Sequence, residues 1–252
     1  MFSLATVQRM FATLLLLALG AQAQIQMRRP PARPHAIVRG DMVGDSETCR
    51  MQPYIDWRKY NLQFFCTPGL TSSEITAPGG WYERALADRP SYIHLMMGTN
   101  DIRLIGPGNQ LPSQVNANDA TLQANVLRAI ALARAARVPL YLGTIPPYYR
   151  TTDWWAVECY KPLADKPVDN RPIGCDWWER PELTLAYNAW LRTLSGVPGV
   201  YVIDYFPLWA DSDGIHFNVL LTDDGGHPNG LGYAPAIALF VKTVGLRDNS
   251  PY

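Results

Sequence analysis

Short apolar runs alternate with amphipathic segments along most of this chain, and that alternation restricts the fold more than any other feature of the sequence. The run at residues 92–97 is continuous rather than alternating, as expected of a strand that is covered on both faces. Similar runs occur at 62–65, 138–142 and 200–203, and a first strand is expected to end near Val43. Strands separated by helices in this way predict a parallel sheet with helices on both sides.

Three segments between or after these runs have the spacing of helices with one apolar face. A helix at 183–194 and a last helix after Gly230, with Pro235 in its first turn, follow the fourth and fifth strands. An earlier helix is expected to be capped by Asn118 or Asp119. Its apolar stripe is expected to contain Leu122, Val126, Leu127 and Ile130.

Length and composition indicate one globular α/β domain at residues 24–252. The chain has 252 residues, of which 48% are hydrophobic and 17% charged, so a sizeable core is expected. Its formal net charge of zero provides no field to attract nucleic acid or an anionic membrane. Nucleic acid is therefore not an expected partner, and the oligomeric state stays open.

Residues 1–23 have the pattern of a secretory signal peptide. Arg9 precedes an apolar run at 11–19, and Ala21-Gln22-Ala23 supplies the small-x-small cleavage pattern. An uncleaved membrane anchor is the alternative, but the run is too short where roughly 20 apolar residues are needed to span a bilayer. We expect a secreted or periplasmic protein that begins near Gln24 and has no membrane partner after cleavage.

The four cysteines suit an exported protein. They lack the paired close spacing of a zinc site, and an even count in an oxidising compartment favours disulfides. Three pairings are open from the sequence. The local pairing is favoured because each pair then brackets one short excursion of the chain, with Cys49 bonded to Cys66 and Cys159 bonded to Cys175.

Three polar motifs contain what a nucleophilic serine needs. They are Gly44-Asp45-Ser46, Gly98-Thr99-Asn100-Asp101, and the segment 224–229 with Asp224 and His227. A serine hydroxyl attacks esters poorly at neutral pH unless a base, an orienter for that base and donors for the developing oxyanion are added. The first two motifs follow predicted strands, so they are expected to meet at the carboxyl edge of the sheet.

With Gly69 after the second strand, these motifs resemble the SGNH/GDSL hydrolases, in order, over about residues 37–244. The segments 67–75, 143–147 and 227–233 are similar to the carbohydrate-esterase (acetylesterase) members of that superfamily. The resemblance implies a three-layer α/β/α sandwich around a central, mainly parallel, five-stranded sheet of the flavodoxin-like type.

The resemblance also implies roles for single residues. Ser46 is expected to be the nucleophile, His227 the general base, and Asp224 the group that orients the imidazole. The backbone N–H groups of Ser46 and Gly69 and the side-chain amide of Asn100 are expected to form the oxyanion hole. Glycine is expected at position 69 because an amide without a Cβ beside it can point closely into the site. Neither a metal nor a cofactor enters this scheme.

Two residues after the serine depart from familiar patterns. Glu47 stands where the family usually has an apolar residue. Thr48 stands where a Gly-x-Ser-x-Gly elbow requires glycine, which argues against the common α/β-hydrolase fold. Gly79 and Gly80 are nearby alternatives to Gly69.

Another Asp-x-x-His sequence competes with the catalytic pair. Asp213 and His216 have the same spacing as Asp224 and His227, but His216 runs into an apolar segment rather than into Pro-Asn-Gly and a helix. We expect His216 to have a structural or rim role. His94, inside a predicted buried strand, is also expected to be structural.

The segment 147–181 is too long and too aromatic for a routine strand-to-helix connection. We interpret it as an insertion or lid, which a disulfide between Cys159 and Cys175 would clamp. Its rings either stack on a sugar or an aryl ester, or form a small core of the insertion itself. The residues considered for substrate binding are Trp154, Trp155, Trp177 and Trp178.

These features predict a secreted serine esterase that removes small acyl groups, above all acetyl, from carbohydrate. A lipase, thioesterase or aryl-esterase with the same catalytic residues is the second hypothesis, and an apolar channel would favour it. The third is a carbohydrate-binding protein with a silent site, which the complete set of Ser, Gly, Asn, Asp and His residues opposes.

Overall fold

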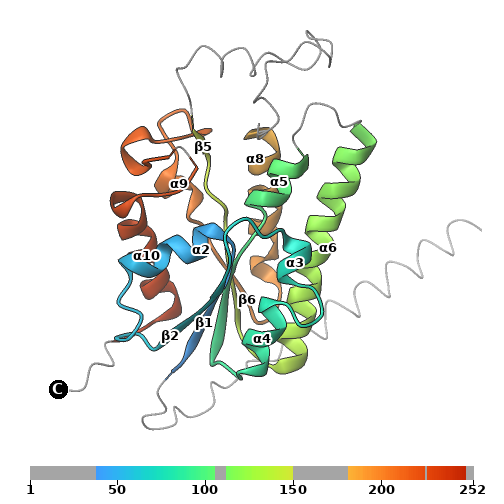
Figure 1. The fold of residues 1–252 in the computed structure, drawn as a ribbon, viewed down its shortest axis with the longest axis vertical. Coiled ribbons are helices and arrows are strands. Elements are labelled where there is room, and N and C mark those ends of the chain that lie inside the picture. The colour runs from blue at the N-terminus through green and yellow to red at the C-terminus, as the bar shows by residue number, and fades with distance from the viewer. Residues whose placement is uncertain (1–37, 106–111, 150–180, 225, 248–252) are drawn as a thin grey trace, which may run out of the picture. The chain divides into compact units, whose positions relative to one another are not determined.

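Five strands form one parallel sheet in the computed structural model, in the order β2-β1-β3-β4-β6 (Figure 1). The structure describes residues 38–105, 112–149, 181–224 and 226–247. Neighbouring strands of this sheet are parallel, which confirms the predicted fold class. The strands are Gly40–Gly44 (β1), Leu62–Cys66 (β2), Tyr92–Met96 (β3), Leu140–Gly143 (β4) and Val200–Ile203 (β6).

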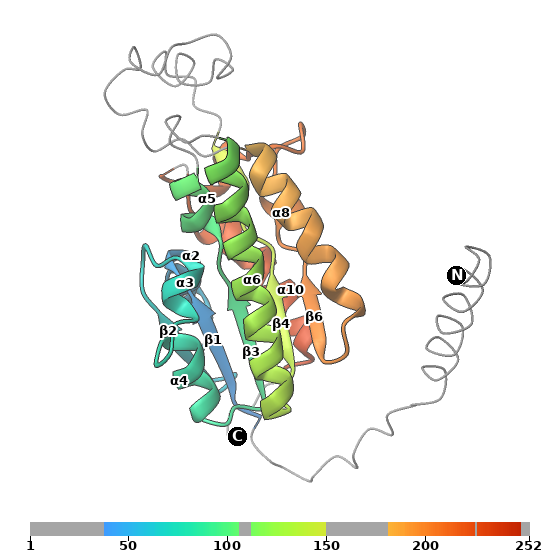
Figure 2. The same ribbon diagram turned by 90° about the vertical axis from the view of Figure 1, so that its right-hand side faces the viewer.

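Helices cover both faces of the sheet and complete three layers (Figures 1 and 2). On one face lie α2 (Ser46–Met51) and α10 (Gly230–Val244). On the other lie α4 (Trp81–Ala87), α6 (Pro112–Ala136) and α8 (Pro181–Thr193). Shorter elements connect these, namely α3 (Ser72–Ile75), α5 (Thr99–Ile105), α9 (Phe206–Trp209), η1 (Gln52–Tyr54), η5 (Leu194–Gly196) and η6 (Val219–Leu221).

Two further strands form a separate, small parallel sheet. It pairs β5 (Tyr148–Tyr149) with β7 (His216–Phe217). The strand β5 is where the chain leaves for the predicted insertion, and α8 is where it returns. The intervening residues 150–180, which include the four tryptophans proposed for substrate binding, lie outside the described residues.

The centre of the sheet is buried on both faces, as the continuous apolar sequence predicts. Every residue of β1 and β3 is buried. From α6, Leu122 and Val126 pack into the same core, but Leu127 is 51% exposed, so its predicted place in the stripe is wrong. At 100° per residue Leu127 points well away from the other two, and Ala129 and Ala133 complete the buried stripe instead.

Two helix starts differ from the prediction. The helix α6 begins at Pro112 rather than at Asn118 or Asp119, and proline suits the first position of a helix because its missing N–H has no intrahelical partner there. The helix α10 begins at Gly230 because the Asn229 side chain accepts hydrogen bonds from the two N–H groups at 231 and 232. Pro235 therefore lies inside the helix and not in its first turn.

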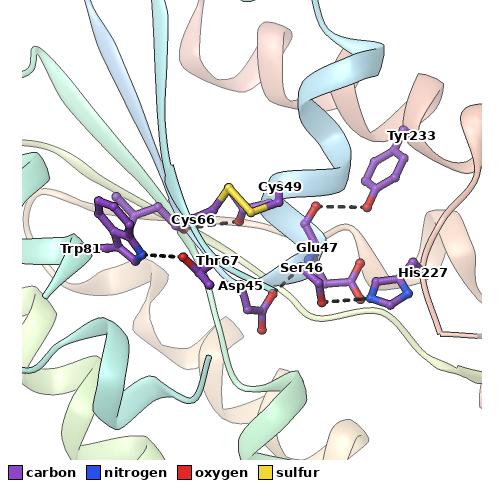
Figure 3. The surroundings of a disulfide bond; sticks show 11 residues. Asp45, Ser46, Glu47, Cys49, Cys66, Thr67, Trp81, His227 and Tyr233 are labelled. Atoms are coloured by element: carbon purple, nitrogen blue, oxygen red, sulfur yellow. Dashed lines mark hydrogen bonds and ion pairs between the residues drawn. A yellow bond between two sulfur atoms is a disulfide. The ribbon is translucent and has the colours of Figure 1, made fainter. Parts of the chain in front are cut away.

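A disulfide joins Cys49 of α2 to Cys66 at the end of β2, which confirms the local pairing predicted for these two residues (Figure 3). Cys159 and Cys175 lie outside the described residues, as does the predicted signal peptide. In the described part of the chain, no helix has the length and apolar character needed to cross a membrane.

Replacing both Cys49 and Cys66 with alanine should lower the free energy of unfolding by about 3 kcal/mol, because the crosslink closes a loop with a sequence separation of 17. In a protein of this size that loss corresponds to a fall of roughly 10 °C in Tm. Differential scanning calorimetry of the variant and the oxidised parent measures it. An unchanged Tm would contradict a stabilising role for this crosslink.

Candidate active site

The strand order places the candidate site at a topological switch point. From β1 the chain passes outward to β2 and then returns to β3 on the other side of β1. Open parallel sheets bind ligands beyond the carboxyl ends of such strands. Ser46 lies two residues after the end of β1, and Asn100 lies four residues after the end of β3, so the two residues flank this point.

Ser46 is the first residue of the helix α2. Asp45 is the N-cap of α2, and its Oδ1 accepts a hydrogen bond from the backbone N–H of Glu47 at 3.0 Å. Gly44, at the end of β1, has no room for a side chain. A Cβ there would lie 2.1 Å from Thr48 Oγ1 and 2.3 Å from the carbonyl oxygen of Met96.

The structure brings together the serine, the histidine and the aspartate that the sequence singles out. Ser46 Oγ lies 2.9 Å from Nε2 of His227 (Figure 3). On the other side of the imidazole, Nδ1 lies 2.8 Å from Oδ2 of Asp224. With Nδ1 donating to the carboxylate, the lone pair of Nε2 faces the serine hydroxyl, which is the tautomer that a general base requires.

Asp224 is fixed by more hydrogen bonds than the one to the imidazole. Its Oδ1 accepts from the backbone N–H groups of Gly226 at 3.0 Å and of His227 at 2.9 Å. Burial raises the pKa of Asp224, but the hydrogen bonds from Gly226 and His227 outweigh it and lower the pKa to about 2. Asp224 is therefore an ionised acceptor at neutral pH.

Arg50 is part of the site and was missed by the sequence analysis. Its NH1 lies 2.5 Å from Oδ2 of Asp224, the same oxygen that faces His227. Arg50 stands four residues after Ser46 on α2, so both side chains lie on one face of that helix. That spacing could have indicated Arg50 only if α2 had been predicted as a helix.

Asn100 lies beside the serine motif, as predicted. Its buried side-chain amide donates to the carbonyl oxygen of Leu70 at 3.0 Å and to Oδ2 of Asp45 at 3.3 Å. Burial, together with the charge of Asp101, raises the pKa of Asp45 to about 7, although hydrogen bonds from Glu47 and Asn100 oppose this. The longer bond to Asp45 is the one that a substrate oxygen could most easily replace.

Gly69 is needed for a different reason from the one expected. Its φ of +84° is in the left-handed region, whereas a Cβ built on it would meet nothing within 4 Å. Backbone conformation, and not close packing, therefore favours glycine here. Leu70, the next residue, accepts the hydrogen bond from Asn100, so this turn is in contact with the site. Gly80, one of the alternatives, is the N-cap of α4.

The competing histidines have partners of their own. His216 Nδ1 lies 2.6 Å from Oδ2 of Asp213, and His216 belongs to β7. His94 is fully buried in β3 with Nε2 3.0 Å from the Tyr205 hydroxyl, and burial lowers its pKa to about 3. Of these histidines, His227 is the one whose ring hydrogen-bonds to Ser46.

Glu47 is fully buried beside Ser46 and His227. Its Oε1 lies 3.9 Å from Nε2 of His227, and Figure 3 shows its carboxylate next to the Ser46 to His227 hydrogen bond. The hydroxyl of Tyr233 in α10 donates to the backbone carbonyl of Glu47 at 3.0 Å. Within the described ranges, no three His, Cys, Asp or Glu side chains are grouped to hold a metal ion.

A hollow of about 230 Å³ opens beside the histidine. Arg50, Tyr54 and His227 contribute to it, and the ring of Tyr54 stacks on Tyr233 at a centroid distance of 5.2 Å. Its remaining lining consists of Pro53, Asp223, Asp224, Pro228 and Asn229. Such a mixed lining, rich in hydrogen-bonding groups, suits a polar ligand better than a long hydrocarbon.

A three-layer α/β/α fold with a serine, a histidine and an aspartate joined at the carboxyl edge of its sheet defines a class of hydrolases that use a serine nucleophile. The sequence profile of the GDSL-like lipase/acylhydrolase family matches residues 43–234, and the chain belongs to that family. It is thus a serine ester hydrolase of the SGNH superfamily. A comparison of the sequence with curated proteins found no match.

Several solved structures share the fold at low sequence identity. A GDSL-like lipase from Bacteroides thetaiotaomicron is 16% identical with a TM-score of 0.62, covering 83% of this chain and 88% of its own. An acylhydrolase candidate from Bacteroides fragilis is 17% identical, with a TM-score of 0.63 and coverage of 82% and 86%. A catalytic mutant of Axe2, an acetylxylan esterase from Geobacillus stearothermophilus, is 14% identical, with a TM-score of 0.53 and coverage of 85% and 97%.

Replacing Asn100 with alanine should lower kcat for an activated ester by about 10²–10³-fold with a smaller change in KM, because an oxyanion donor acts mainly in the transition state. Steady-state kinetics on p-nitrophenyl acetate provide the measurement. Asn125→Ala is the matched control, since the Asn125 amide donates to Ser72 and Ser73 rather than at the serine motif. Equal losses in both variants would argue against the assigned role of Asn100.

Proposed function

We propose that this enzyme is a secreted serine esterase that removes small acyl groups, above all acetyl, from carbohydrate. The observation that carries the catalytic part is the continuous hydrogen-bonded series from Ser46 Oγ through His227 to Asp224. A hydroxyl with a neutral imidazole at 2.9 Å has a base in position for its proton.

In the first half of the reaction, Ser46 Oγ attacks the ester carbonyl carbon while its proton passes to Nε2 of His227. The carbonyl oxygen becomes an oxyanion, which accepts hydrogen bonds from the N–H groups of Ser46 and Gly69 and from the Asn100 amide. When the tetrahedral intermediate collapses, the bond to the sugar oxygen breaks. His227 gives that oxygen its proton, and an acyl-serine ester remains.

In the second half, water takes the place of the alcohol. His227 accepts a proton from the water as its oxygen attacks the acyl carbon, and then returns a proton to Ser46 Oγ as the carboxylic acid leaves. Asp224 stays ionised through both halves and stabilises the imidazolium that forms twice. The balance of the cycle is one ester and one water consumed, with one alcohol and one acid released.

The substrate class has support from the surroundings of His227 and from similar structures. The hollow beside the imidazole has carboxylate, amide and guanidinium groups around a half-exposed Tyr54 ring, a lining that suits a hydroxylated alcohol. An acetylxylan esterase is among the proteins with this fold. The tryptophans at 154, 155, 177 and 178 remain proposed as stacking surfaces for a sugar.

Secretion has support from one feature of the sequence and one of the structure. The leader at 1–23 has the composition of a signal peptide. The Cys49 to Cys66 disulfide is typical of proteins that fold in an oxidising compartment.

A lipid or aryl ester is the second candidate for the substrate. Its basis is a group of exposed apolar side chains close to Asn229, which borders the same hollow. Leu220 is 71% exposed and Leu231 is 68% exposed, and both hydrogen-bond to Asn229 through their backbones. Such residues could receive a longer acyl chain or an apolar alcohol.

The catalytic assignment predicts that Ser46→Ala and His227→Ala each lower kcat/KM for p-nitrophenyl acetate by at least about 10³-fold. The matched control is His216→Ala, which removes the imidazole of the other Asp-x-x-His pair and should retain most of the activity. Retention of activity in Ser46→Ala would reject the mechanism, and loss in His216→Ala comparable to that in His227→Ala would reassign the base.

The substrate assignment predicts that acetyl esters are hydrolysed fastest in a series of p-nitrophenyl esters from acetyl to decanoyl, and that acetate is released from acetylated xylo-oligosaccharides. Acetate release can be followed by an enzyme-coupled assay, with Ser46→Ala as the blank. Rates that rise with acyl chain length, without acetate release from the oligosaccharides, would favour a lipase instead.

A further inference from the structure

The helix that carries the nucleophile also presents two charged side chains to the histidine loop. Glu47 Oε1 lies 3.9 Å from Nε2 of His227, and Arg50 NH1 contacts Oδ2 of Asp224. The imidazole therefore has a carboxylate near each of its two nitrogen atoms. Neither Glu47 nor Arg50 belongs to the Ser, His, Asp and Asn set described above.

Arg50 changes what Asp224 can do for the imidazolium. Arg50 and Nδ1 of His227 share one oxygen of the Asp224 carboxylate, so the arginine offsets part of the negative charge that faces the ring. Beside His227 the opposite charges of Asp224 and Arg50 offset each other, and the carboxyl group of Glu47 lies at Nε2. Asp223 and Tyr54 also line the hollow beside the ring.

Burial gives Glu47 a stronger influence than its distance alone suggests. Its side chain is 0% exposed and that of His227 is 19% exposed, whereas the side chains of Arg50 and Asp224 are 51% and 39% exposed. Water screens the outer pair much more than the inner one. A charge on Glu47 therefore acts on the imidazole through a medium of lower dielectric constant.

The distance of 3.9 Å between Glu47 Oε1 and His227 Nε2 excludes one kind of interaction and permits another. It is too long for a hydrogen bond, so Glu47 does not compete with Ser46 or with a leaving alcohol for the Nε2 proton. It is short enough for a strong charge interaction with an imidazolium. A buried carboxylate at this place is costly for folding, and such costs are characteristic of functional sites.

We propose that Glu47 is a positioning residue that stabilises the imidazolium of His227 as a second carboxylate, replacing the negative charge that Arg50 withdraws from Asp224. This inference rests on the proposed catalytic role of His227. During attack by Ser46, the proton that reaches Nε2 creates a positive charge between Asp224 and Glu47. The positive charge of the imidazolium in the transition state is then stabilised by a carboxylate on each side of the ring.

The test uses Glu47→Gln, which removes the charge and keeps the shape. The negative charge of Glu47 favours protonated His227, so its removal should move the acid limb of the kcat/KM profile to lower pH by about 1–3 units. The plateau rate should fall roughly tenfold because a less basic imidazole is a weaker general base. Arg50→Gln should move the acid limb in the opposite direction, by a smaller amount because Arg50 is exposed.

The imidazole titration of His227, followed by NMR in the full-length protein, is measured alongside the kinetics. Glu83→Gln is the matched control, because Glu83 pairs with Arg128 on the far helices and should change neither readout. If Glu47→Gln does not fold, Glu47→Met removes the same charge at similar length, and the same shift is expected.

The two readouts distinguish failure of this inference from failure of the proposed function. An unshifted or upward-shifted titration in Glu47→Gln overturns the inference even if the enzyme hydrolyses esters. If Glu47→Gln lowers the pH at which His227 titrates but the parent protein hydrolyses no ester, the charge coupling is supported and the proposed function is rejected. Shifts of the same sign in the Glu47 and Arg50 variants would also overturn it, since a general loosening of the site cannot produce opposite signs.

Discussion

The hydrogen bond between Ser46 Oγ and His227 Nε2 joins residues that are 181 positions apart, and the proposed mechanism depends on that contact. One hydrogen bond contributes only about 1 kcal/mol net, so it cannot bring the two ends of the chain together by itself. The apolar core does so. Tyr233 and Phe240 of α10 are fully buried in the core, and a buried aromatic or aliphatic side chain contributes about 1.5–3 kcal/mol.

The helix α2 shows how the fold fixes the reactive group. A helix of 6 residues is too short to be stable alone. Here three residues of the helix are each attached to a different part of the fold. The backbone oxygen of Glu47 accepts from Tyr233 of α10, Cys49 is bonded to Cys66 of β2, and Arg50 pairs with Asp224 in the histidine loop. Ser46 therefore has little freedom to leave its place opposite the imidazole.

The sequence was sufficient for the features that follow from local patterns. Apolar runs located four of the five strands, and a first strand was expected to end near Val43. The order of the polar motifs after the strands indicated which side chains meet at the carboxyl edge. Features that depend on tertiary surroundings were not accessible. Arg50 has no motif, Leu127 is apolar but exposed, and the start of α6 at Pro112 lies in a segment without a clear apolar stripe. The need for glycine at 69 arises from a backbone angle that sequence does not display.

Gly44 also has a consequence for protein engineering. Strands in the middle of a parallel sheet are rich in valine and isoleucine, whose branched side chains suit a covered surface. At this position any Cβ would collide with the hydroxyl of Thr48 and with the main chain of the adjoining strand. A designer who grafts the serine loop onto another scaffold must therefore transfer the last strand residue as well, because a recipient with a branched residue there would force its own strands apart before the nucleophile was in place.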